Sequence, residues 1–434
     1  MLDSIKGAFR SPDLRTKLLI TLGILTVFRL GSFIPAPGVI AGNVQLCLTG
    51  GGASGGIYDM VNMFSGGALL SVSIVALGVM PYITASIMMQ LMKVIVPRLQ
   101  ELHANGETAT VTQYTRYLAV GMSALNATTV VTMARTGNLL PGCALPLVTD
   151  QGFMTSLIMI ISLIAGALLV MWMGEKITER GIGNGMSLLI FTSVASGFPT
   201  SLGTIGRTQG WGVFASVLAV GLVTIALVVF VEQSQRRIPV VYAKRVVGRQ
   251  TLGGNTTFLP IKVNMAGVVP VIFASTLLSL PSMIAQFATG NQSNAGPEWA
   301  QWVTANLTKG DHPIYMTVYT LFIIGFSFFY VAITFEPKEI AGNMKKYGGF
   351  VPGFRPGKPT ERLLAYVSNR ITAAGALYIG IIALIPLVAL VLLQANQNFP
   401  FGGAAILIMV GVGLETVKQI SAQMEQRSYP ALMR

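Results

Sequence analysis

The sequence predicts an all-helical membrane protein with ten transmembrane helices, arranged as two inverted halves of five. Of its 434 residues, 52% are hydrophobic and only 10% are charged, whereas a soluble domain carries about 25% charged residues. Long uncharged windows also recur, each with room for the roughly 20 apolar residues that cross a bilayer as a helix. A membrane β-barrel would show short alternating segments instead.

The windows place the spans in chain order. They cover residues 17–35, 74–96, 114–134, 153–174, 182–203, 211–232, 266–289, 314–335, 372–394 and 402–420. Five spans lie in an N-terminal half, residues 1–200, and five in a C-terminal half, residues 201–434. Because five is odd, the halves enter the membrane with opposite orientation, as inverted repeats do. We expect no cleavable signal peptide, because no small-residue cleavage site follows the first apolar run.

Lysine and arginine set the expected orientation. If both termini are cytosolic, 25 of the 29 basic residues fall in cytosolic segments, three fall in outer loops, and Arg29 lies within the first span. This bias predicts cytosolic termini and explains the net charge of +13 as a basic cytosolic surface. Two cytosolic loops, 233–265 and 336–371, are longer than insertion requires. Their charge and their glycine- and proline-containing turns indicate docking surfaces for acidic or phosphate-rich partners.

Residues that commonly carry catalysis are scarce. The chain has two histidines, expected on opposite sides of the membrane, and two cysteines. No metal-binding pattern or nucleophile elbow is found, so we expect no enzyme activity, metal or cofactor. A secondary transporter is the main alternative, and a membrane scaffold is a more distant one. Against a transporter, no Asp, Glu or His falls near the predicted midplane of a span.

The uncharged run from Val61 to Met92 is too long for one span and too short for two. Gly66 and Gly67 loosen it, and Pro81 is expected to kink it. One long tilted helix is an alternative to two shorter segments.

Five long motifs occur in order along the whole chain. They are NMFSGGAL with ALGVMPYITASIMMQL (62–91), ITERGIGNGMSLLIF (177–191), QRRIPVVYAKRVVGR (235–249), LPIKVNMAGVVPVIFAS (259–275) and NMKKYGGFVPGFRPGKPT (343–360). Together they resemble the SecY family, the central subunit of the bacterial Sec protein-conducting channel. The resemblance implies a channel in the bacterial plasma membrane that moves unfolded preproteins across it and releases membrane spans sideways into lipid.

The resemblance also assigns residues. Residues 58–73 would form a weakly anchored plug helix, with Met63, Phe64, Ser65, Gly66, Gly67 and Leu69 in it, followed by a span from about Ile74. A pore ring would comprise Ile83, Ile87, Met186, Ile190 and Ile272. Each pair four residues apart faces one side of its helix, and an apolar ring seals by dewetting. Gly413 stands where the family often has a bulky aliphatic residue, unless Met409 or Val410 reaches in.

The family pattern further implies a lateral gate between the second–third and seventh–eighth spans, with Gln90 and Asn126 at it. The expected partners are SecE, SecG, the motor ATPase SecA, the ribosome, signal-bearing preproteins and membrane lipids. SecA and the ribosome would dock on the two long basic loops. The residues chosen for docking are Arg236, Arg237, Lys244, Arg245, Arg249 and Arg355.

The two cysteines suggest a feature of this sequence rather than of the family. Cys47 and Cys143 both fall in predicted outer loops of the same half, on the oxidising side where disulfides persist. A bond between them would tether the loop that leads into the plug. Small apolar fillers are the alternative interpretation.

Overall fold

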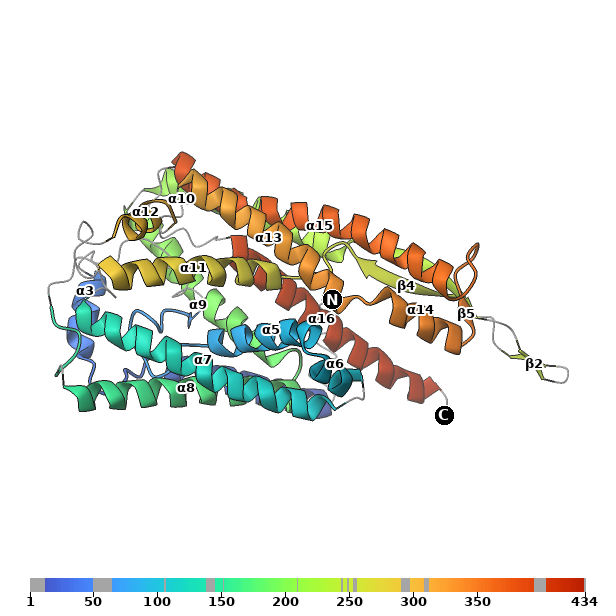
Figure 1. The fold of residues 1–434 in the computed structure, drawn as a ribbon, viewed down its shortest axis with the longest axis horizontal. Helices are drawn as coiled ribbons and strands as arrows, with labels where there is room; N and C mark the ends of the chain where they lie inside the picture. Colours follow the sequence, from blue (N-terminus) through green and yellow to red (C-terminus); the bar gives the residue numbers. More distant parts are fainter. Residues whose placement is uncertain are drawn as a thin grey trace.

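The computed structural model describes residues 12–49, 65–104, 107–137, 145–150, 152–208, 210–242, 245–247, 250–252, 256–289, 297–307, 312–393 and 403–432. They form an elongated bundle in which most long helices run along the long axis, with a small sheet at one end (Figure 1). We call that end, where the strands and α14 lie, the basic end, because it carries the two long basic loops.

The helices follow the predicted order. The first group is α2 (Pro12–Gly31), α3 (Ala41–Thr49), α5 (Met80–Ile95), α6 (Pro97–Ala104), α7 (Thr108–Thr136), α8 (Phe153–Arg180) and α9 (Gly185–Thr208). The second is α10 (Trp211–Gln233), α11 (Val269–Thr289), α12 (Glu298–Leu307), α13 (Pro313–Thr334), α14 (Pro337–Lys346), α15 (Lys358–Leu393) and α16 (Gly403–Leu432).

Six helical stretches in the described part of the chain are long and apolar enough to cross a membrane. They are Ala109–Thr136, Phe153–Arg180, Trp211–Gln233, Pro313–Lys346, Lys358–Ile385 and Ala405–Met424. The other four predicted spans correspond to α2, α5, α9 and α11. In α9 and α11 the apolar helical stretches are shorter, Gly185–Pro199 and Val269–Leu278, and each of these two helices contains an internal proline. The protein is a multi-pass membrane protein.

The second predicted span is shorter than expected. Residues 66–79 form turns, broken by a bridge at Ser73, and the helix begins only at Met80. Val72 (φ 45°) and Gly78 (φ 53°) adopt positive φ values, which an α-helix does not contain. Pro81 therefore lies in the first helical turn, where its missing N–H costs nothing. The predicted kink at this proline is wrong, because the proline lies in the first turn of the helix rather than inside it.

Two further boundaries differ from the predictions. Helix α9 continues to Thr208, so the division at residue 200 falls inside a helix and the connection to α10 lies at residues 209–210. Helix α15 begins at Lys358, so the ninth span continues a helix that starts within the predicted loop 336–371. Hydropathy marks where apolar side chains begin, whereas a helix can extend past that point because its backbone hydrogen bonds are internal.

The two long loops combine into one sheet. Strand β1 (Gln235–Tyr242) pairs antiparallel with β4 (Thr256–Lys262) from the same loop and with β5 (Gly349–Phe350) from the other, in the order β4-β1-β5. A second pair, β2 (Arg245–Val247) and β3 (Gln250–Leu252), extends beyond them (Figure 1). A separate apolar cluster holds the unit together: Ile238, Ile261, Ala341, Val351, Leu364 and Val367.

The helices up to α9 and those from α10 onward meet mainly on one side. Helix α9 packs extensively against α10 and α16. Among the described elements, the extensive contacts of α5 and α7 are with α6, α8 and each other. The bundle is therefore joined along α9, while α5 and α7 lie opposite α11 and α13 across a looser boundary.

Candidate functional site

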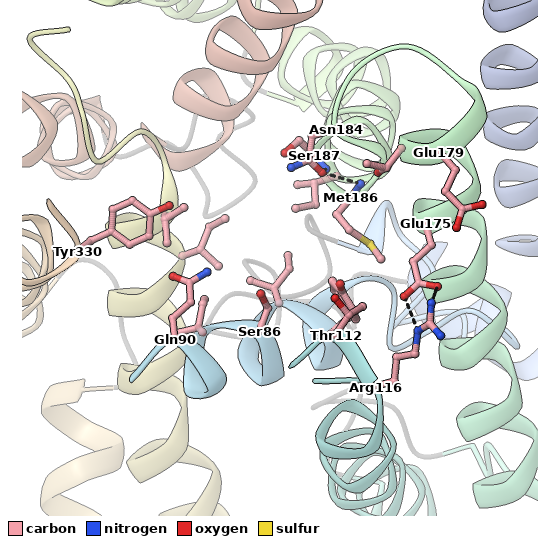
Figure 2. Close-up of a pocket in the computed structure, with 17 residues that line it drawn as sticks. Ser86, Gln90, Thr112, Arg116, Glu175, Glu179, Asn184, Met186, Ser187 and Tyr330 are labelled. Carbon is pink, nitrogen blue, oxygen red and sulfur yellow. Dashed lines mark hydrogen bonds and ion pairs between the residues drawn. The ribbon is translucent and has the colours of Figure 1, made fainter. Parts of the chain in front are cut away.

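A cavity of about 470 Å³ lies at this looser boundary. It receives side chains from α5, α7, α8, α9, α11 and α13, so both groups of helices build it. The lining residues are Tyr82, Ile83, Ser86, Ile87, Gln90, Thr112, Arg116, Glu175, Thr178, Glu179, Asn184, Met186, Ser187, Ile190, Val269, Ile272 and Tyr330. Figure 2 shows the polar members around it.

The apolar part of the lining comes from three helices. Helix α5 contributes Ile83 and Ile87, α9 contributes Met186 and Ile190, and α11 contributes Ile272. Ile87, Ile190 and Ile272 are only 5–6% exposed. The structure thus brings all five residues of the predicted ring to one cavity. The i, i+4 spacing explains why α5 and α9 each present two of them to the same space.

The polar part of the lining includes an ion pair that sequence reasoning did not identify. Arg116 donates two hydrogen bonds to Glu175, from Nε to Oε1 and from Nη2 to Oε2, both 2.8 Å long. This fork-to-fork geometry is the strong form of an arginine–carboxylate contact, and it ties α7 to α8. Both residues were visible as charges at the ends of spans, but 58 residues separate them in the sequence.

Helix α9 begins beside this ion pair, and two side-chain hydrogen bonds hold its first turn. Asn184 Oδ1 accepts from the backbone N–H of Met186 at 3.1 Å, and Thr178 Oγ1 accepts from the N–H of Gly185 at 2.9 Å. Gly185 also lies so close to Gly174 that an added Cβ would collide with the Gly174 carbonyl. The segment GIGNG (181–185) therefore closes the α8–α9 turn and positions Met186.

The two predicted gate residues have different positions. Gln90 of α5 lines the cavity, on the same side as Tyr330 of α13 (Figure 2). Asn126 lies further along α7, half-buried, and is not part of the lining. The gate assignment of both residues stays a prediction.

The described part of the plug segment forms hydrogen bonds with neighbouring segments. Arg29 Nη1 of α2 donates to the Gly66 carbonyl at 2.7 Å, and Leu69 N–H donates to Ser65 Oγ at 3.0 Å. Ser65 and Leu69 are 3% and 4% exposed. Backbone bonds from Ala36 N to Val72 O and from Ile74 N to Ile34 O add further links. These contacts link residues 65–74 to neighbouring segments, and the expected weak anchoring stays a prediction. Residues 66–72 form turns rather than the predicted plug helix, and Met63 and Phe64 lie outside the described residues.

Comparisons with known proteins agree with this geometry. The profile of the family described as SecY matches residues 73–417. The Protein translocase subunit SecY of Micrococcus luteus is 57% identical, over the full length of both chains. The chain belongs to the SecY family. A solved structure described as a protein conducting channel matches with a TM-score of 0.65 at 18% identity, covering 96% of this chain and 94% of the other.

A second solved structure, Sec61 in the canine ribosome-channel complex from the endoplasmic reticulum, matches with a TM-score of 0.62 at 16% identity, covering 96% of this chain and 94% of that one. At such low identity, the two solved structures support the fold of this SecY-family chain. They share a ten-helix architecture in two halves with it.

The residues predicted for partner docking lie at the basic end where the structure describes them, and their docking role stays a prediction. Arg236 and Arg237 are exposed neighbours on β1, and Arg355 is exposed in the turn before α15. Because strand side chains alternate, Arg236 and Arg237 point to opposite faces of the sheet. Lys244 and Arg249 lie outside the described residues, and Arg245 is described only as backbone of β2.

The last span leaves space where the SecY-family pattern often has a bulky residue. An added Cβ at Gly413 would meet no atom within 4 Å. Met409 and Val410 are half-buried, and neither lines the cavity. Within the described part of the chain, helix α16 therefore contributes no side chain to the cavity wall.

The structure describes only one of the two cysteines of the predicted disulfide. Cys47 lies on α3, is 5% exposed and packs in an apolar cluster with Leu69 and Val131. Cys47 does not carry a free thiol, which is consistent with the predicted bond. Cys143 lies outside the described residues, so the bond stays a prediction. Among the described residues, no three His, Cys, Asp or Glu side chains gather as metal ligands.

Proposed function

We propose that this chain is the channel subunit of a bacterial Sec translocon, which moves unfolded preproteins across the plasma membrane without catalysing a reaction itself. The observation that carries the proposal is the cavity whose apolar wall comes from α5 and α9 of the first group of helices and α11 of the second. Such a wall can separate when the two groups of helices part.

The apolar ring suits a cargo of variable sequence. Ile83, Ile87, Met186, Ile190 and Ile272 offer no hydrogen bond or charge to a passing chain, so they favour no particular side chain. The same property excludes water and ions when no chain is present, because a narrow apolar passage dewets.

The looser boundary between α5/α7 and α11/α13 supports a lateral exit into lipid. Opening there would break few packing contacts, because α5 and α7 pack chiefly among themselves and with α6 and α8. The opposite side, where α9 packs against α10 and α16, would act as the hinge. Gln90 and Tyr330 would face each other across the exit near the cavity.

The basic end would be cytosolic and would receive the driving partner. Its sheet pairs strands from both loops, whose partners Val241 and Phe350 are more than 100 residues apart, so a partner docked on one strand would also contact the other loop. The solved Sec61 structure belongs to a ribosome-channel complex, which supports the ribosome as one partner. SecA, SecE and SecG are proposed from the family resemblance, with both termini of this chain in the cytosol.

Reconstitution tests the proposal against the transporter alternative. The protein, purified with SecE and SecG, is placed in liposomes with SecA, ATP and a signal-bearing preprotein, and the preprotein is then treated with protease. We expect ATP-dependent protection of the preprotein, and none for the same preprotein without its signal sequence. Protection that is absent, with uptake of a small solute driven by an imposed ion gradient, would favour a secondary transporter.

A further inference from the structure

Exposed aromatic side chains bracket the apolar length of two membrane helices. On α8, Phe153 (79% exposed) and Trp172 (53%) stand 19 positions apart. On α10, Trp211 (79%) and Phe230 (74%) are also 19 positions apart. At 1.5 Å per residue this is about 29 Å, close to the roughly 30 Å of a bilayer hydrocarbon core.

The residues around these aromatics fit the same boundaries. No charged residue occurs between the two aromatics of either helix, and the exposed side chains between them include Leu157, Ile161, Leu222 and Leu227. Charges resume immediately beyond, at Glu175 on α8 and Glu232 on α10. Aromatic rings that flank an exposed aliphatic band are typical of the membrane–water interface.

The short helix α12 carries two more exposed tryptophans at the end of the bundle opposite the basic end (Figure 1). Trp299 is 50% exposed and Trp302 is 54% exposed. They are three residues apart and therefore lie on one side of the helix, whereas Ala300 is fully buried. Helix α12 packs against α11 and α13 through its buried side. The four tryptophans of the chain thus lie at the ends of the uncharged stretches of α8 and α10 or on α12.

We propose that α12 is an interfacial helix that binds the headgroup region of the phospholipid bilayer through Trp299 and Trp302. The aromatic ends of α8 and α10 at the same end of the bundle, Phe153 and Trp211, lie in that same interface. The occupant is lipid because α12 lies at the end of the bundle where α8 and α10 begin with the exposed Phe153 and Trp211. Since α12 packs on α11, which carries Ile272, and on α13, this contact also fixes the ends of both helices relative to the bilayer.

Depth-dependent fluorescence quenching tests the proposal. A Trp172→Phe/Trp211→Phe protein retains only the α12 pair, and a Trp211→Phe/Trp299→Phe/Trp302→Phe protein retains only Trp172 as a matched reference at the other interface. Each is reconstituted in bilayers whose lipids carry bromine either near the headgroup or near the chain end. We expect stronger quenching of both proteins by the shallow bromine than by the deep one, and little quenching by aqueous iodide.

Two outcomes would overturn the proposal: quenching of the α12 pair by iodide alone, which would place it in water, or stronger quenching by the deep bromine. If the variants accumulate poorly, the unmodified protein provides a second test. A lipid with a photoactivatable headgroup should label the peptide containing residues 298–307, and a lipid activated at its chain end should not. If the headgroup probe does not label this peptide, lipid does not cover α12, and water or a protein partner does.

Discussion

Arg29 donates a hydrogen bond from Nη1 to the carbonyl oxygen of Gly66, 2.7 Å away, and so links α2 to the segment that precedes α5. Gly66 has φ +69°, and a Cβ at this position would meet Arg29 Nη1 at 2.9 Å and the Cα of Ser193 at 3.0 Å. The glycine is needed for both its conformation and its lack of a side chain. The guanidinium also lies 5.2 Å from the Phe33 ring centroid. An alternative role for this arginine, reaching only toward the membrane surface, does not account for the bond to Gly66.

Replacing Arg29 should loosen the plug segment. Arg29→Met removes the charged donor and leaves the Gly66 carbonyl without this partner, so we expect a severalfold rise in resting ion conductance in planar bilayers. Arg15→Met is the matched control, because Arg15 is exposed on the same helix. Equal conductance in the two variants would show that the bond does not hold the channel closed.

The apolar cavity wall should control leakage in the same assay. Ile87→Asn puts a polar side chain into the wall that must exclude water, and Ile190→Gly removes a side chain from it. Resting conductance should therefore rise in both variants. Met88→Asn serves as the control, since Met88 is 42% exposed on the same helix and is not part of the cavity lining. Wild-type conductance in both cavity variants would mean that these residues only pack the core.

Arg355 should act in partner docking rather than in membrane insertion. Arg355→Glu changes one of many basic residues at this end, so topology and accumulation in the membrane should be retained while SecA-driven secretion is lost. Arg362→Glu introduces the same charge change at an exposed position on α15. Secretion assays should separate the two variants, and normal secretion by Arg355→Glu would contradict the docking assignment.

Gly166 should be required for stability because α8 packs directly on the turns before α5. A Cβ at this position would collide with the backbone carbonyl of Ile74. Relieving this collision would require the backbone around Ile74 to shift together with the residues packed on it. We expect Gly166→Ala to destabilise the protein by about 1–3 kcal/mol, seen as a lower midpoint of thermal unfolding. Gly23 lies on α2, and a Cβ added there would meet no atom within 4 Å. Gly23→Ala should therefore leave the midpoint unchanged or raise it. A midpoint for Gly166→Ala that matches Gly23→Ala would contradict this packing.

The predicted bond between Cys47 and Cys143 can be examined directly. Protein purified without reductant should show a linked pair of peptides by mass spectrometry, and reduction should release both. Bridged cysteines have Cα atoms below about 7 Å apart, so the loops containing them would be held close together. Full alkylation of both cysteines in the unreduced protein would exclude the bond.

The sequence by itself determined the features that depend on local composition and periodicity. Charge depletion located the membrane helices, and the lysine and arginine distribution identified the end that carries the two long basic loops. The i, i+4 spacing placed Ile83 with Ile87, and Met186 with Ile190, on one face of their helices, whereas the family resemblance assigned both pairs to one ring. Helix boundaries were less accurate at Met80, Thr208 and Lys358, where glycine conformation or helix continuation overrides hydropathy.

Only the tertiary structure decided the features that join distant segments. The pairing of Val241 with Phe350 builds one sheet from two loops, and Arg116 meets Glu175 only because α7 packs on α8. The bond between Arg29 and Gly66 likewise depends on how α2 lies against the turns before α5. Each of these contacts depends on the relative placement of whole elements, which burial and steric fit determine and local sequence patterns do not encode.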